Sequence, residues 1–161
     1  MLHISRVRRA DAKDEDEILA MCRQMHVENG MFTMSDDRVR EIISRAWKKQ
    51  GAIIGVIGER GKLEASIYLL LTNIWYSNDW HLEELWNFVR PDFRRSNNAK
   101  EMIAFAKRCG DELGISVIIG IMSNIRTESK IRLYERSLGK PAGAFFLHQP
   151  LRQMNATALA G

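Results

Sequence analysis

The chain has 161 residues, 45% of them hydrophobic, and its 24 basic and 20 acidic residues give a net charge of +4. This length fits one compact domain, and the composition argues against a disordered or membrane-embedded chain. The charge is too small to predict a nucleic-acid partner. The two cysteines, Cys22 and Cys109, and the scattered histidines show no metal-ligand spacing, so we expect neither a disulfide framework nor a metal site.

The apolar runs are all shorter than the roughly 18 to 20 residues that a transmembrane helix needs. The opening residues, MLHISRVRRADAKDEDE, lack the apolar block of a signal peptide. We therefore expect a cytoplasmic protein that does not contact a membrane.

The first half of the chain predicts a strand, two helices and a hairpin. ISRVRRA alternates apolar and charged residues like a half-exposed strand, and the acidic run that follows suits the start of a helix that ends near Gly30. A second helix begins near Ser35 and Asp36, which are both suitable capping residues. The glycines of GERGK at 58–62 then predict a tight turn between two antiparallel strands.

The second half predicts strands alternating with helices. NDWHLEELWNFV at 78–89 is a strand candidate, and the apolar spacing over 99–113 predicts a long helix that Gly114 ends. ISVIIGIM at 115–122 is short and almost entirely apolar, which favours a buried parallel strand. A further helix and a closing strand at 142–149 complete a mixed α/β sheet, and we expect residues 151–161 to form a tail.

The stretch VRPDFRRSNNAK at 89–100 joins the end of a strand to the start of the long helix. A helix start presents free backbone N–H groups and a partial positive charge, and Arg94, Arg95 and Lys100 add full charges. The stretch therefore suits a pyrophosphate, although an arginine-rich corner can also be a solvated surface.

The order of elements and this stretch resemble the GNAT superfamily of acyl-CoA-dependent N-acetyltransferases. The family motif is V-x-P, a few residues, then Q/R-x-x-G-x-G/A opening a helix; here Arg94 takes the Q/R place, Asn97 the first glycine place and Ala99 the G/A place. The resemblance implies a single GNAT-like domain over 1–150. Its central sheet would be mixed and mostly antiparallel, flanked by helices, with a splay between the fourth and fifth strands.

The resemblance further implies an enzyme that moves an acetyl group from acetyl-CoA, its co-substrate, to a primary amine by direct attack in a ternary complex. Asparagine at position 97 departs from the motif, but it is among the residues that best tolerate φ > 0. The residues implied for coenzyme binding are Phe88, Val89, Arg94, Arg95, Ser96, Asn97, Asn98, Ala99, Lys100 and Asn124.

Two further residues match family positions that serve the chemistry. Tyr134 occupies the place of a tyrosine that protonates the departing thiolate, although its helix position would also suit a core aromatic. Glu83 and Glu84 are candidates for the base, beside a water relay. Strict strand alternation puts Glu83 on the side of Asn87 and Glu84 on that of Trp86. The spacing from Glu83 to Arg94 is similar to that between the base and the loop in histone-acetylating family members, and this resemblance favours Glu83.

The acceptor amine and the oligomeric state stay open, with a homodimer among the states common in similar proteins. Glu28, Trp75, Tyr76 and Trp80 are candidates to line a pocket for a cationic or aromatic amine. The alternative functions are a non-catalytic CoA-binding or partner-binding module and, with less support, a nucleic-acid binder.

Overall fold

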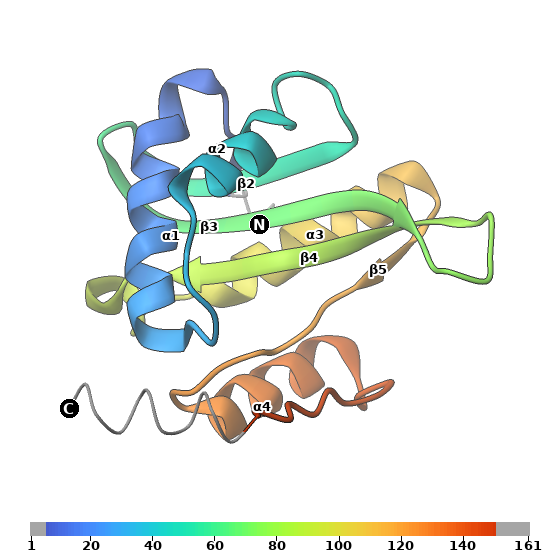
Figure 1. The fold of residues 1–161 in the computed structure, drawn as a ribbon. Helices are drawn as coiled ribbons and strands as arrows, with labels where there is room; N and C mark the ends of the chain where they lie inside the picture. The colour runs from blue at the N-terminus through green and yellow to red at the C-terminus, as the bar shows by residue number, and fades with distance from the viewer. Residues whose placement is uncertain (1–5, 151–161) are drawn as a thin grey trace, which may run out of the picture.

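The computed structural model describes residues 6–150, which form one five-stranded sheet with helices on both faces (Figure 1). The strand order is β1-β2-β3-β4-β5, with β5 parallel to β4 and the other neighbours antiparallel. The strands are β1 Arg8–Arg9, β2 Ala52–Glu59, β3 Lys62–Asn73, β4 Trp80–Val89 and β5 Ser116–Ile118. The predicted mixed, mostly antiparallel sheet is confirmed; the predicted tail at 151–161 lies outside the described residues.

Four α-helices accompany the strands within the described range: α1 Glu15–Asn29, α2 Asp36–Ser44, α3 Asn98–Leu113 and α4 Thr127–Leu138. The predicted start of α2 at Ser35 and the predicted end of α3 at Gly114 are confirmed, whereas α2 ends at Ser44, before Ala46 and Trp47. The Ser35 hydroxyl accepts the Arg38 N–H at 3.3 Å, and Gly114 ends α3 in the left-handed conformation at φ 67°. Between residues 6 and 150, no helix combines the length and apolar character needed to cross a membrane.

Helices cover both faces of the sheet (Figure 1), and a separate hydrophobic core lies on each face. One core lies under α1 and α2, where Ile18, Leu19 and Ile43 pack on Tyr68 and Trp86. The other lies under α3, whose buried side chains pack on the opposite face of β3 and β4. These α3 side chains are Met102, Phe105, Ala106 and Cys109. Because each face of β4 belongs to a different core, the direction of a β4 side chain fixes which helices it meets.

A β-bulge in β4 changes the predicted direction of its side chains. Tyr68 pairs with Trp86 and the next residue, Leu69, pairs with Glu84, so Leu85 is an extra residue opposite β3. Glu84 therefore shares the α3 face with Asn87, whereas the alternation in the sequence had placed these two residues on opposite faces. That prediction was wrong because one inserted residue shifts the two-residue period.

The region after α3 differs from the sequence prediction in two respects. β5 has only three residues, and Ser116 and Ile118 are exposed because β5 is an edge strand rather than a buried one. The expected strand at 142–149 is absent from the described structure, where Phe145 and Phe146 are 82% and 95% exposed. Since the chain leaves the sheet after Ile118, β5 offers only a short edge for a further strand to pair with.

Candidate active site

β4 and β5 separate after a short shared ladder, as the predicted splay requires. His81, Leu82 and Glu83 pair with β5, whereas β4 continues to Val89 without a partner on that side. α4 lies beside α3 beyond this opening (Figure 1). The Lys107 ammonium donates to the Ser137 carbonyl at 3.4 Å. The structure thus has an open strand edge between β4 and the chain after β5, with α4 beside it.

Tyr134 reaches this edge from α4. The Asn87 side-chain amide donates to the Tyr134 hydroxyl oxygen at 3.0 Å, so a strand residue fixes the phenol. Burial raises the pKa of Tyr134, and the nearby Glu84 carboxyl raises it further. The hydroxyl therefore keeps its proton at neutral pH and is available as a proton donor. Sequence reasoning assigned no role to Asn87; a polar residue in an otherwise apolar strand segment was the available signal.

Glu84 is the second polar group on this face. Burial raises its pKa from 4.5 to about 8, and its Oε2 atom has no hydrogen-bond partner within the described structure. The Asn87 Oδ1 atom is likewise buried and unpartnered there. Glu84 is consequently protonated for the most part at neutral pH, and the site holds unsatisfied polar atoms next to Tyr134.

Glu83 points to the other face of β4. It pairs with Leu70, which packs against the core under α1 and α2, and its side chain is 48% exposed. His81 lies near it, with 4.0 Å between the imidazole Nε2 and the carboxyl Oε2. Glu83 is also the last β4 residue that pairs with β5, so its backbone lies where the strands begin to separate.

The loop before α3 has an ordinary backbone at the position where the motif has glycine. Asn97 has φ −83° and ψ 6°, which any residue adopts, so positive φ is not required there. Arg95, Asn97 and Lys100 are exposed, and Ala99 is half-buried. The loop therefore presents basic side chains to solvent at the start of a 16-residue helix.

Ser96 and Asn98 have structural contacts that the sequence did not indicate. The Asn98 N–H donates to the Ser96 hydroxyl at 3.1 Å, which satisfies one of the free donors at the helix start. The Asn98 side chain is fully buried, where its amide donates to Glu64 at 2.8 Å and its carbonyl accepts from Arg6 at 3.1 Å. The Asn98 side chain is thus engaged away from the exposed surface of the loop.

Arg94 and Asn124 both contact the end of α1. Arg94 forms an ion pair with Glu28 at 2.5 Å, and its Nε–H donates to the Val89 carbonyl at 3.2 Å. The Asn124 N–H donates to the Asn29 side-chain carbonyl at 3.3 Å. The end of α1 therefore bridges the loop before α3 and the segment after β5, and it brings Arg94 and Asn124 to the same opening.

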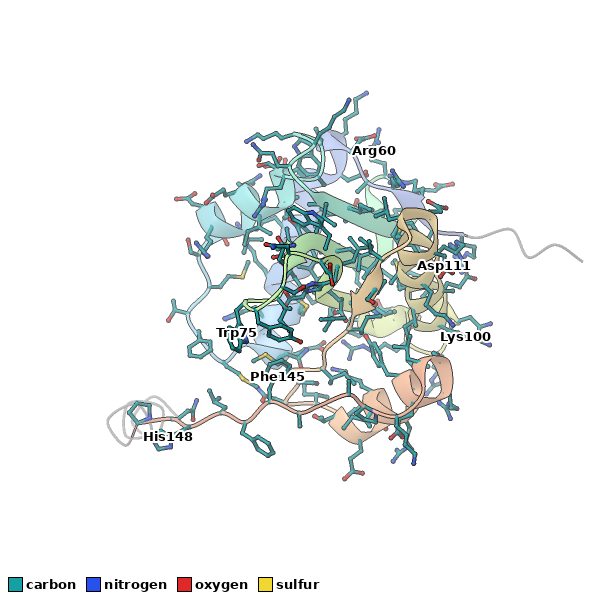
Figure 2. The ribbon with its side chains drawn as sticks, turned by 90° about the vertical axis from the view of Figure 1, so that its right-hand side faces the viewer. Arg60, Trp75, Lys100, Asp111, Phe145 and His148 are labelled. Atoms are coloured by element: carbon teal, nitrogen blue, oxygen red, sulfur yellow. The ribbon has the colours of Figure 1, made fainter. Side chains whose placement is uncertain are left out.

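The structure does not bring Glu28 and the aromatic residues into one pocket, so that prediction was wrong for the group of four. Trp75 and Tyr76 lie on the hairpin between β3 and β4, where they are 92% and 69% exposed, and Trp80 begins β4 (Figure 2). Glu28 lies near the other end of this ten-residue strand, roughly 30 Å away at 3.3 Å per residue. The strand length separates these residues, which sequence positions alone did not show.

The described part of the chain contains no group of three or more histidine, cysteine or acidic side chains arranged to hold a metal ion. The arrangement as a whole suits acyl transfer to a nucleophile. It combines a half-buried phenol that can donate a proton, a strand edge that can pair with an extended ligand, and a basic helix start.

No protein-family profile and no curated protein sequence matches this chain. Solved structures do match it over most of its length. A Trypanosoma brucei acetyltransferase is 17% identical over 90% of this chain and 98% of its own, with a TM-score of 0.65. A predicted acetyltransferase from Clostridium acetobutylicum, solved with acetyl-CoA, is 13% identical over 91% and 96% of the two chains, with a TM-score of 0.72.

A third similar structure is AAC(6')-Iy in complex with the bisubstrate analogue CoA-S-monomethyl-acetylneamine. It is 14% identical over 89% of this chain and 96% of its own, with a TM-score of 0.69. At these identities the likeness establishes the fold. The chain has the GNAT-like α/β fold of acetyltransferases, as its sequence resemblance implied.

Proposed function

We propose that the protein is an acetyl-CoA-dependent N-acetyltransferase that moves the acetyl group directly to a primary amine in a ternary complex. The observation that carries this proposal is the hydrogen bond from Asn87 to Tyr134, which holds a proton-donating phenol at the splayed strand edge of a GNAT-like fold. Similar structures that contain acetyl-CoA or a CoA bisubstrate analogue support the choice of co-substrate.

The coenzyme would lie along the opening between β4 and the chain after β5. Arg94, Arg95 and Lys100, with backbone N–H groups from Ser96 to Ala99, would hold the pyrophosphate at the start of α3. The backbone of Phe88 and Val89 would pair with the pantetheine amides as an added strand does, and Asn124 would lie beside them. Because the Asn98 N–H already donates to the Ser96 hydroxyl and the Ser96 N–H donates to the Phe93 carbonyl at 3.1 Å, the N–H groups of Asn97 and Ala99 have the larger role.

In the reaction the amine nitrogen forms a bond to the thioester carbonyl carbon, and the carbon–sulfur bond of the tetrahedral intermediate then breaks. Tyr134 gives its proton to the departing sulfur, and a base removes a proton from the attacking nitrogen. Much of the rate enhancement would come from holding the amine and the thioester together.

Glu83 suits the role of base better than Glu84. A base has to be ionised, and the pKa of about 8 keeps Glu84 mostly protonated at neutral pH. Glu83 is half-exposed on the opposite face from Tyr134, so the base and the acid would act from two sides of the strand. This division keeps the two proton transfers apart.

The test is calorimetry with acetyl-CoA, followed by a thiol-release assay over a panel of primary amines. The proposal predicts binding of one acetyl-CoA and amine-dependent release of free CoA. Binding without turnover on any amine would instead support a non-catalytic CoA-binding module. Failure to bind acetyl-CoA, together with salt-sensitive binding to DNA or RNA, would support a nucleic-acid binder.

A further inference from the structure

Arg94 is held by three contacts at the end of β4. Its guanidinium pairs with Glu28 at 2.5 Å, its Nε–H donates to the Val89 carbonyl, and its Cζ lies 5.7 Å from the centre of the Phe88 ring. The side chains of Arg94 and Glu28 are only 31% and 17% exposed. Arg94 thus occupies a backbone acceptor of the strand edge that the proposed pantetheine arm would use.

A second cation, Lys130, stands near this pair. Burial lowers the pKa of Lys130, the positive charge of Arg94 lowers it further, and Glu28 partly opposes both effects. The Lys130 ammonium donates to the Ser123 hydroxyl at 2.5 Å, which ties it to the segment after β5. Arg94 and Lys130 together carry more positive charge than the Glu28 carboxylate balances. An entering anion is therefore attracted to this site and competes with Glu28 for Arg94.

We propose that Glu28 is a specificity-determining residue that the coenzyme controls. The pyrophosphate takes Arg94 from Glu28, and the freed carboxylate then binds a second positively charged group on the acceptor. This inference rests on the proposed acetyl-CoA-dependent function and assigns the acceptor to a class, namely amines that carry a further cationic group.

The energetic reason lies in the low exposure of Glu28. A partly buried carboxylate that loses its direct ion-pair partner is costly, and Lys130 is held by the Ser123 hydroxyl instead, so the coenzyme complex favours a ligand that supplies a new cation. Phosphate oxygens compete well for Arg94 because a guanidinium can bind them through two parallel hydrogen bonds. Coenzyme and cationic acceptor therefore strengthen each other's binding by the same factor.

The first measurement is calorimetric titration of the full chain with CoA, whose free thiol prevents turnover. Glu28→Gln removes the charge that holds Arg94, so this variant is expected to bind CoA about fivefold more tightly than the wild type. Asp92→Asn is the matched control, because Asp92 is an exposed carboxylate just before the same arginine. The control is expected to stay within about twofold of the wild type, as a general charge effect is small at exposed sites. Unchanged or weaker CoA binding by a folded Glu28→Gln protein overturns the inference.

The second measurement repeats the titration with saturating 1,5-diaminopentane or with 1-pentanol, which carries no ammonium group. The diamine is expected to tighten CoA binding by the wild type about fivefold, and the alcohol is expected to leave it unchanged. Neither compound is expected to affect Glu28→Gln. Equal effects of the diamine on both proteins, or no effect on the wild type, overturn the acceptor assignment. If the wild type binds no CoA, the proposed function itself is contradicted. If the wild type binds CoA and Glu28→Gln binds it with the same affinity, only this inference is contradicted.

Discussion

Asn87 on β4 donates a hydrogen bond of 3.0 Å to the hydroxyl oxygen of Tyr134 on α4. The bond connects the splayed strand to a helix that has no fully buried residue, so it is a specific anchor between the two. Asn87 accordingly acts as a positioning residue in the proposed mechanism, and Tyr134 as the proton donor.

Tyr134→Phe removes the proposed acid and leaves most of the side-chain volume in place. We expect kcat to fall about 100-fold with little change in acetyl-CoA affinity, since general acid catalysis typically contributes 10²–10⁴-fold. A thiol-release assay measures kcat, and calorimetry measures the affinity for acetyl-CoA. Tyr76→Phe, on an exposed hairpin tyrosine, is the matched control and should keep full activity. A Tyr134→Phe enzyme with wild-type turnover removes the acid assignment.

Glu84 makes stability depend on pH. Its pKa is about 8 in the folded state, compared with 4.5 for the free group. Between pH 4.5 and pH 8, the folded protein therefore keeps a proton on Glu84 that the unfolded chain releases. The free energy of unfolding therefore falls as pH rises through this window. We expect Glu84→Gln to gain stability relative to the wild type by about 3–4 kcal/mol more at pH 8 than at pH 5.

Denaturant unfolding at the two pH values measures the Glu84 effect. Glu41→Gln is the control, because Glu41 is an exposed carboxylate on α2, away from β4. If the two variants show the same pH dependence, burial of Glu84 is not the cause.

Asn97→Gly restores the residue of the family motif. Because Asn97 already has a negative φ, glycine relieves no strain, and we expect the affinity for acetyl-CoA to change by less than about threefold. Calorimetry beside an Asn97→Ala control measures the effect. A tenfold gain specific to glycine would show instead that the missing side chain matters for close approach of the pyrophosphate.

Asn98→Ala tests the structural role of a residue that the motif had assigned to coenzyme binding. The change removes one hydrogen bond each from the Glu64 carboxylate and the Arg6 guanidinium, which keep their mutual ion pair at 3.1 Å, and it empties a fully buried position, so we expect a loss of about 1–3 kcal/mol in the free energy of unfolding. Acetyl-CoA binding by the folded protein should be nearly unchanged. If acetyl-CoA binding falls strongly without a loss of stability, Asn98 contacts the coenzyme and its role is not structural.

Sequence reasoning predicted the elements well where a local signal was strong. The turn at 58–62, the Ser35 cap and the Gly114 end of α3 depend on neighbouring residues, and the structure has all three. The resemblance to a family supplied the fold and the splay, which no local pattern in the chain encodes.

The errors arose where the outcome depends on distant parts of the chain. The bulge at Leu85 is visible only in the pairing with β3, and it moved Glu84 to the face of Tyr134. The apolar run after α3 looked buried, but nothing in it showed that β5 would be an edge strand. The ion pair between Arg94 and Glu28 joins residues 66 positions apart, so spacing in the sequence could not reveal it.

The most direct test of the proposed function is native mass spectrometry of the purified protein with acetyl-CoA, before and after a primary amine is added. The proposal predicts a complex with one acetyl-CoA that loses the mass of its acetyl group when an amine substrate, expected to be a diamine, is present. A protein that remains free at saturating acetyl-CoA, or a complex whose mass no amine changes, would contradict it.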